Sequence, residues 1–264
     1  MKGDRRGAKL SRFDSSSKKN GNEAPTMMPT KLHALTFALA CFSTCCSESA
    51  EPPAKPAPQE QQVDKTVDPI EAIQQFIAAQ KIDKTKEGWK ERLPKPPKLT
   101  FDPTKDYFWV VETNVGSFTV KLLPDVAPMH VSSYLYLTKL GYWEGIKFHR
   151  VIQRFMAQGG DPTGTGRGGP GYRMDLELKA GVTHSKAGIL STANSGPNTD
   201  GSQFFLTFRA TKSLDGGYTV VGEMTDGVET TLRELEKRGM ADDPGTPSEP
   251  LFIRSAKIEV KAKG

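Results

Sequence analysis

FHRVIQRFMAQGGD, residues 148–161, and ILSTANSGPNTDGSQFFLTF, residues 189–208, are the two stretches of this chain that decide its fold. Each contains apolar runs of strand length, and each includes a turn rich in Gly, Asn, Asp or Pro. The same stretches place the cation of Arg150 among aromatic, thioether and amide side chains. They contain no G-x-S-x-G elbow and no metal-ligand spacing, which argues against the common hydrolase and metal-site motifs.

A site of this composition suits a reaction that breaks no bond, namely rotation about the peptide bond before proline. The barrier to this rotation is about 18–20 kcal/mol, so the uncatalysed step takes tens to hundreds of seconds. When the amide twists, its nitrogen becomes a hydrogen-bond acceptor, and a fixed guanidinium beside it stabilises only that state. Arg suits this role because it stays protonated and presents rigidly arranged donors. We therefore expect Arg150 to be catalytic, with no cofactor and no metal.

Residues from about 99 to 261 resemble the cyclophilin family of peptidyl-prolyl cis-trans isomerases. The motifs FHRVIQRFMAQGGD, GILSTANSGPNTDGSQFFLTF and SLDGGYTVVGEM stand in the order and spacing of that family. The resemblance implies that Arg150 is the catalytic arginine. It also implies a proline pocket formed by Phe155, Met156, Phe205 and Leu214, and groups that hold the substrate backbone and the arginine, namely Gln158, Ala193 and Asn194. His149 and His184 match family positions. Neither is assigned a chemical role, and both are expected to be hydrogen-bonded structural residues.

Two positions differ from the best-known members of the family. Ser213 stands where many cyclophilins have a Trp associated with tight cyclosporin binding, and Tyr218 stands where they have a His at the pocket edge. Because Arg150 is unchanged, we expect retained catalysis and weak inhibition by cyclosporin. Tyr218 resembles the bacterial branch, and its ring and hydroxyl are expected to contact substrate. The alternative is a peptide-binding or chaperone module that uses the same groove with little turnover.

Short alternating segments predict a mainly β domain. Residues 107–112 and 117–123 alternate around a turn at 113–116, which predicts a hairpin. Further strands are expected at 147–151, 155–159, 188–193, 203–208, 219–224 and 252–260, and helices at about 131–138 and 228–238. The resemblance implies a closed eight-stranded antiparallel barrel with a helix over each end, so the substrate groove is expected on the outer face.

A short amphipathic helix is expected ahead of the barrel, within residues 67–98. Asp68 and Pro69 form a helix start, and Ile70, Ile73 and Ile77 follow at spacings of three and four residues. Packing against the barrel is the favoured role of this helix, and binding of a separate partner is the alternative. A Pro-rich connector then leads into the isomerase-like domain, which is assigned to residues 99–264.

Residues 1–66 predict export rather than a folded domain. In the leader, residues 1–40, Lys31 precedes an apolar run, and the sequence ALA at 38–40 matches the small-residue pattern of signal-peptide cleavage. Cleavage after Ala40 would leave Cys41 at the new N-terminus. The segment ALAC resembles a bacterial lipoprotein signal, so Cys41 is the predicted lipidation site. Residues 41–66 are rich in Pro, Glu and Gln and predict a disordered tether. A short buried helix or a disordered basic tail is the alternative for the leader.

Charge and composition restrict the classes of partner that the chain is expected to bind. The net charge is +5, but the first 26 residues hold seven Lys or Arg against three Asp or Glu, and Lys31 adds another positive charge. The remaining chain is therefore close to neutral, which argues against a broad nucleic-acid surface. The loop GTGRGGPG, residues 164–171, lacks the Lys-Ser or Lys-Thr ending of a nucleotide-binding loop.

The three Cys residues, at 41, 45 and 46, all precede the barrel region, so its core needs no disulfide. We expect a monomer that is exported to the periplasm or anchored to a membrane through lipid. Its expected partners are proline-containing peptides and unfolded proteins.

Overall fold

The computed structural model describes residues 67–241 and 245–264. Its helices are α1 (Pro69–Gln80), α2 (Pro128–Lys139) and α3 (Thr231–Lys237), with 3-10 turns η1 (Trp89–Glu91) and η2 (Lys212–Leu214). Its strands are β1 (Lys105–Thr113), β2 (Gly116–Leu122), β3 (Arg150–Ile152), β4 (Met156–Gly159), β5 (Ile189–Thr192), β6 (Phe204–Thr207), β7 (Val220–Asp226) and β8 (Ile253–Ala262). The predicted hairpin is confirmed, because β1 and β2 pair from Thr113 and Gly116 outward.

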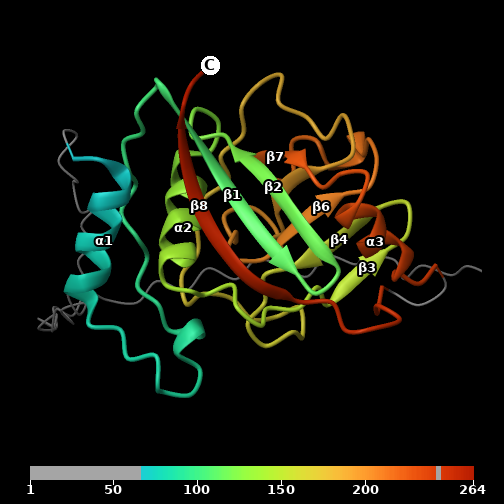
Figure 1. The fold of residues 1–264 in the computed structure, drawn as a ribbon, viewed down its shortest axis with the longest axis horizontal. Coiled ribbons are helices and arrows are strands. Elements are labelled where there is room, and N and C mark those ends of the chain that lie inside the picture. The colour runs from blue at the N-terminus through green and yellow to red at the C-terminus, as the bar shows by residue number, and fades with distance from the viewer. Residues whose placement is uncertain (1–66, 242–244) are drawn as a thin grey trace, which may run out of the picture. The chain divides into compact units, whose positions relative to one another are not determined.

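The eight strands form one antiparallel sheet in the order β3-β4-β6-β5-β7-β2-β1-β8 (Figure 1). Alternate residues of each strand face the core, as the period of two in the sequence predicts. On β1, Tyr107, Trp109 and Val111 have no exposed area, and on β2 Phe118 and Val120 match them. Their burial provides most of the hydrophobic driving force on this side of the sheet.

The closed barrel implied by the resemblance is corrected in one respect. Among the described residues, no regular ladder joins β3 to β8. The chain just before each of these strands meets in a single bridge, between Lys147 and Phe252. The outer edge of β3 is occupied by the loop after α3, because Val151 N donates to the carbonyl of Gly245 at 2.5 Å. A three-residue strand with that edge already paired has no free donors left for β8.

Helix α2 is buried on all sides rather than along one face. Every residue from 130 to 138 is buried. One side packs on the sheet, where the Tyr134 ring lies 5.1 Å from that of Trp109. The other side packs on α1, where the Tyr136 ring lies 5.5 Å from that of Phe76. Helix α2 is therefore covered by the sheet on one side and by α1 on the other.

Helix α1 begins and ends as its sequence predicts. The Asp68 carboxylate accepts a hydrogen bond from Ile70 N at 2.9 Å, and Pro69 occupies the first turn, where its missing N–H costs nothing. The helix ends at Lys81, which has a φ of 49°. Ile73 has no exposed area and belongs to the central core, so the predicted packing against the domain is confirmed. The described residues thus contain the three helices that the sequence predicts, namely α1, α2 and α3.

Within residues 67–241 and 245–264, no helix has the length and apolar character needed to span a bilayer. The predicted leader and the whole of the predicted tether, including Cys41, lie outside the described residues.

Candidate active site

Arg150 is held at the start of β3 by a chain of side-chain amides. Its Nη1 donates to Gln158 Oε1 at 3.4 Å. Gln158 Nε2 donates to Gln203 Oε1 at 3.0 Å, and Gln203 Nε2 donates to the carbonyl of Gly168 at 2.9 Å. The guanidinium is therefore oriented by neutral groups, and it keeps most of its donors available for a ligand.

Strand register places the predicted cation and pocket residues on one face of the sheet. Arg150 lies opposite Gln158, which lies opposite Phe205 in the next ladder. Met156, two residues before Gln158, points to the same side because side chains alternate along a strand. Their strand neighbours Val151, Ala157, Phe204 and Leu206 face the central core instead. Met156 and Phe205 are also buried but lie outside that core, so the sequence places large apolar side chains on the outer face.

Phe205 is enclosed by aromatic neighbours. The imidazole of His184 stacks on it at 5.8 Å with an interplanar angle of 21°. The ring of Tyr218 meets it edge-on at 5.4 Å and 87°. This edge-to-face contact supports the prediction that Tyr218 lies at the rim of the apolar pocket.

His184 is fixed by hydrogen bonds at both ring nitrogens. Its Nδ1 lies 2.8 Å from Asp215 Oδ1, and its Nε2 lies 2.8 Å from Ser191 Oγ. The backbone N–H and the ring of His184 donate to Asp215 and thereby lower the pKa of that carboxyl group. The connectivity matches that of a hydrolase triad, but Ser191 has no exposed area and lies within a strand. A hydroxyl that no substrate reaches cannot act as a nucleophile, so the trio supports Phe205 instead.

The remaining predicted residues lie on loops around this face. Ala193 N donates to the carbonyl of Gln203 at 2.9 Å, and Asn194 Nδ2 donates to the carbonyl of Gly217 at 3.1 Å. Leu214 ends η2 and is half-buried. Phe155, also half-buried, lies in the turn between β3 and β4.

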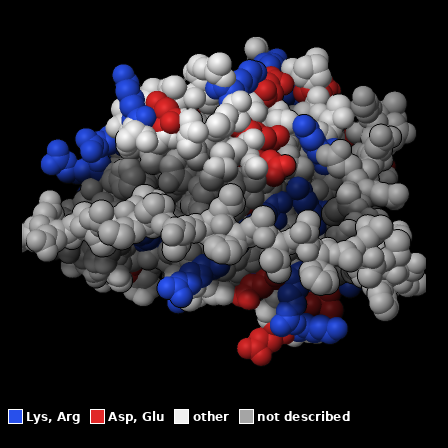
Figure 2. Space-filling view, turned by 180° about the vertical axis from the view of Figure 1, so that it is seen from behind, with Lys and Arg blue, Asp and Glu red and all other residues white. Residues whose placement is uncertain are grey.

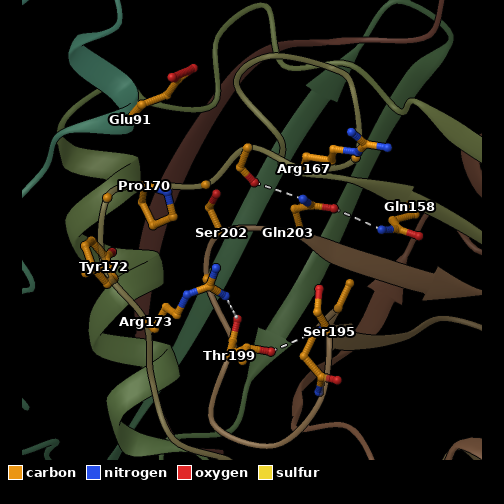
Figure 3. A pocket seen from close by; sticks show the side chains of 17 residues that line it. Glu91, Gln158, Arg167, Pro170, Tyr172, Arg173, Ser195, Thr199, Ser202 and Gln203 are labelled. Atoms are coloured by element: carbon orange, nitrogen blue, oxygen red, sulfur yellow. Dashed lines mark hydrogen bonds between the residues drawn. The ribbon is translucent and has the colours of Figure 1, made fainter.

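A cavity of about 560 Å³ lies beside the Gln158–Gln203 pair (Figure 3). Its walls come from the glycine loop at 166–171, from residues 193–203 and from Glu91 in η1. Figure 3 shows the Arg173 guanidinium reaching the carbonyl of Thr199, to which it donates at 3.1 Å. Backbone, amide and hydroxyl groups dominate this lining, and such groups can form hydrogen bonds with the backbone of an extended peptide.

The glycine loop is organised by Asp161. This carboxylate accepts from Thr163 N at 2.7 Å, Gly166 N at 2.6 Å and Gly168 N at 3.1 Å. Burial opposes ionisation of Asp161, but the hydrogen bonds outweigh it and lower the pKa of the carboxyl group. A Cβ at position 168 would lie 2.1 Å from Asp161 Oδ1, so Gly168 is needed for this close approach. Gly164, Gly166 and Gly171 have φ values of 69°, 82° and 97°, so glycine also lets this loop turn sharply.

Sequence reasoning missed several of these residues. Gln203 was not assigned, although it lies two residues before Phe205 and therefore on the same face. His184 was expected to be hydrogen-bonded, and it is; its partners Ser191 and Asp215 lie 7 and 31 residues away in the chain. His149 was expected to be hydrogen-bonded too; that is wrong, because both of its ring nitrogens are buried without a partner among the described residues. Burial lowers the pKa of His149, so its ring is kept neutral.

These features define a class of protein: an antiparallel sheet whose outer face carries an oriented arginine beside buried apolar side chains and an adjacent polar cavity. Comparison with known proteins gives the family. The family model described as "Cyclophilin type peptidyl-prolyl cis-trans isomerase/CLD" matches residues 108–258, which is more than half of the chain. The chain belongs to this family, and it is a peptidyl-prolyl cis-trans isomerase.

Relatives and solved structures agree with this assignment. Peptidyl-prolyl cis-trans isomerase-like 1 from Rhizopus delemar is 48% identical over 127 residues, covering 47% of this chain and 77% of the relative. The protein of the same name from Aspergillus fumigatus is 43% identical over 157 residues, covering 58% and 92%. A cyclophilin-type isomerase from Cryptosporidium parvum has 34% identity and a TM-score of 0.55, covering 60% of this chain and 99% of that one. Another structure of the parasite protein was determined in the presence of the dipeptide Ala-Pro.

Proposed function

We propose that Arg150 is the catalytic residue of this isomerase and that it acts on proline-containing peptides and unfolded proteins. The observation that carries the proposal is the shared face of Arg150, Met156 and Phe205, which puts a fixed guanidinium beside buried apolar side chains. The proposed proline pocket consists of Phe155, Met156, Phe205 and Leu214, with Tyr218 at its rim. The dipeptide studied with the parasite relative supports this substrate class.

The proposed mechanism needs no covalent step. The pyrrolidine ring enters the apolar pocket, and Ala193 and Asn194 hold the substrate backbone. As the amide twists, the lone pair of its nitrogen is no longer delocalised into the carbonyl group, so the nitrogen can accept a hydrogen bond from the Arg150 guanidinium. Gln158 keeps the guanidinium in place through the 3.4 Å hydrogen bond, so little reorganisation is needed at the transition state.

The variant Arg150→Ala tests this role. We expect kcat/KM on a tetrapeptide with one Ala-Pro bond to fall by about a hundredfold or more, because a transition-state donor is lost. Arg150→Lys should restore only a small part of the activity, since a mobile ammonium does not reproduce the fixed fork. Arg254→Ala is the matched control, because Arg254 is an exposed arginine on β8. Activity close to wild type in Arg150→Ala, with the circular dichroism spectrum unchanged, would refute the assignment.

We further propose that the enzyme is exported and held at a membrane, where it assists the folding of extracytoplasmic proteins. The support is in the sequence: a charged leader, an apolar run, the ALA pattern at 38–40 and Cys41 directly after it. Residues 41–66 would separate the folded domain from the membrane as a semi-rigid tether.

Intact-mass analysis of the native protein tests export and lipidation together. We expect a mature chain that begins at Cys41 and carries the added mass of acyl chains. Cys41→Ala should remove that added mass, whereas the control Cys45→Ser should retain it. A native mass equal to that of the unmodified chain from Met1 would contradict the proposal.

A further inference from the structure

His130, in the first turn of α2, is a fully buried histidine with a carboxylate at each ring nitrogen. Its Nδ1 lies 2.7 Å from Glu177 Oε2, and its Nε2 lies 2.9 Å from Asp200 Oδ2. Ionised carboxylates only accept hydrogen bonds, so both contacts are satisfied only when both ring nitrogens carry a proton. The geometry therefore favours the imidazolium form of His130.

Glu177 also replaces the missing N-terminal cap of α2. The residue at the cap position, Ala127, has no side chain to accept a hydrogen bond, and Pro128 has no N–H. Glu177 accepts instead from Met129 N and His130 N, both at 3.0 Å. One carboxylate thus satisfies two orphan donors of the helix and one nitrogen of the imidazole.

Asp200 connects the same imidazole to the wall of the groove. Its Oδ2 also accepts from Thr219 Oγ1 at 3.0 Å, and that hydroxyl accepts in turn from Glu177 N at 3.0 Å. The network is closed, because it returns to the segment that holds Glu177.

Asp200 lies in the loop at 194–203, which lines the cavity beside the Gln158–Gln203 pair. Directly before it, Thr199 Oγ1 accepts from Ser195 N at 2.9 Å, as Figure 3 shows. Thr219 directly follows Tyr218, at the rim of the proline pocket. The network therefore joins α2 to two parts of the groove and contacts neither Arg150 nor Gln158 through any hydrogen bond among the described residues.

The charges around His130 agree with this reading. Burial opposes its protonation, but the hydrogen bonds and charges of Asp200 and Glu177 outweigh burial and raise the pKa of His130. Burial raises the pKa of Glu177, and its hydrogen bonds with His130 and Met129 outweigh burial and lower it. Glu177 and Asp200 are the charged groups that face the ring. Protonated His130 stabilises the folded state. This contribution to the free energy of unfolding is complete below the unfolded pKa of about 6.5 and is lost as the pH rises through the higher folded pKa.

We propose that protonated His130 is a positioning residue that ties the groove loop at 194–203 to α2, so that its deprotonation weakens peptide binding and leaves the catalytic step unchanged. This inference rests on the proposed function for the location of the groove. The proposal for His130 concerns peptide affinity, whereas the proposal for Arg150 concerns the isomerisation rate. Each proposal can therefore fail in its own measurement without the other.

Exchange NMR on the full-length protein and the Ala-Pro tetrapeptide measures both quantities. For the wild type, we expect the dissociation constant of the tetrapeptide to rise at least about fivefold between about pH 6 and about pH 9. The isomerisation rate of the bound peptide should change by less than about twofold over the same range. In Asp200→Asn, the amide donates to the neutral imidazole, so protonation of His130 is no longer needed. We expect this variant to keep wild-type affinity at about pH 6 and to lose most of the pH dependence.

Asp226→Asn is the matched control, since Asp226 is an exposed aspartate at the end of β7, and it should follow the wild-type pH profile. A purely structural role for the network would lower stability in Asp200→Asn without changing the pH profile, and that result would overturn the proposal. If Asp200→Asn does not fold, the wild type still decides. The chain has four His, so the ring of His130 can be followed by NMR. A folded pKa of His130 below about 6.5 would also overturn the proposal. So would titration of His130 with no accompanying change in the chemical shift of the Ser195 amide.

Discussion

Single carboxylates determine the shape of the groove at the residue scale. Asp161 orders the glycine loop, whereas Glu177 and Asp200 order the opposite wall through His130. In each case an ionised oxygen accepts from backbone or side-chain donors that come from separate turns of the chain. Hydrogen bonds to a charged group are stronger than neutral ones, so these few residues hold long irregular segments in place.

The variant Asp161→Asn tests whether an ionised carboxylate is needed to hold the glycine loop in place. The amide cannot accept all the donors that converge on the carboxylate, so we expect the free energy of unfolding to fall by about 1–3 kcal/mol at neutral pH. The folded pKa of Asp161 is lowered, so its contribution is present above the unfolded pKa of about 3.9 and is lost as the pH falls through the folded value. Urea unfolding at several pH values measures both effects. Equal loss of stability at acidic and neutral pH would contradict the charged role.

Helix α1 shows how an element outside the family match becomes part of the core. It precedes residue 108, where the matched region begins, yet Ile73 is as buried as the residues of β1. The connector after α1 is fixed as well, because Leu93 N donates to the carbonyl of Pro170 at 2.9 Å and Glu91 reaches the cavity wall. The segment therefore completes the burial of α2 and supports the glycine loop from behind.

We expect Ile73→Ala to lower the free energy of unfolding by about 2–5 kcal/mol, because a large side chain is removed from a fully buried site. Isomerase activity at low temperature should stay within about twofold of wild type, because Ile73 packs in the core and does not line the cavity. Gln74→Ala, at an exposed neighbouring position, is the control for helix propensity. Thermal unfolding and the tetrapeptide assay provide the two measurements, and wild-type stability in Ile73→Ala would contradict the packing role.

At the scale of the whole molecule, sheet order brings the site together. Residues that are distant in sequence, such as Arg150, Phe205 and Ser191, become neighbours because β3, β4, β6 and β5 lie side by side. On the face opposite to that of Figure 1, Figure 2 shows Lys and Arg side chains interspersed with Asp and Glu over the described residues that are visible. The excess positive charge of the chain lies in residues 1–31, which agrees with the proposed role of this segment as an export signal.

Much of the fold was predictable because it depends on local rules. The hairpin of β1 and β2, the start of α1 and the strand segments follow from period, turn residues and caps, which are properties of neighbouring residues. The proposed catalytic arginine and its pocket came from three motifs that resemble one family, at residues 148–161, 188–208 and 213–224. The open seam between β3 and β8 was not predicted, because it depends on which distant segment occupies a free strand edge.

By itself, the amino-acid sequence determined the class of the domain, the strand segments and the placement of Arg150 beside apolar and amide groups. Only the tertiary structure decided that Gln203 supports Gln158, that His184 lies between Asp215 and Ser191, and that His130 joins Glu177 to Asp200. The physical reason is that a hydrogen bond between residues 45 or 70 positions apart leaves no periodic signal in the sequence. Such a bond exists only after the hydrophobic faces of the strands have packed and fixed the sheet order.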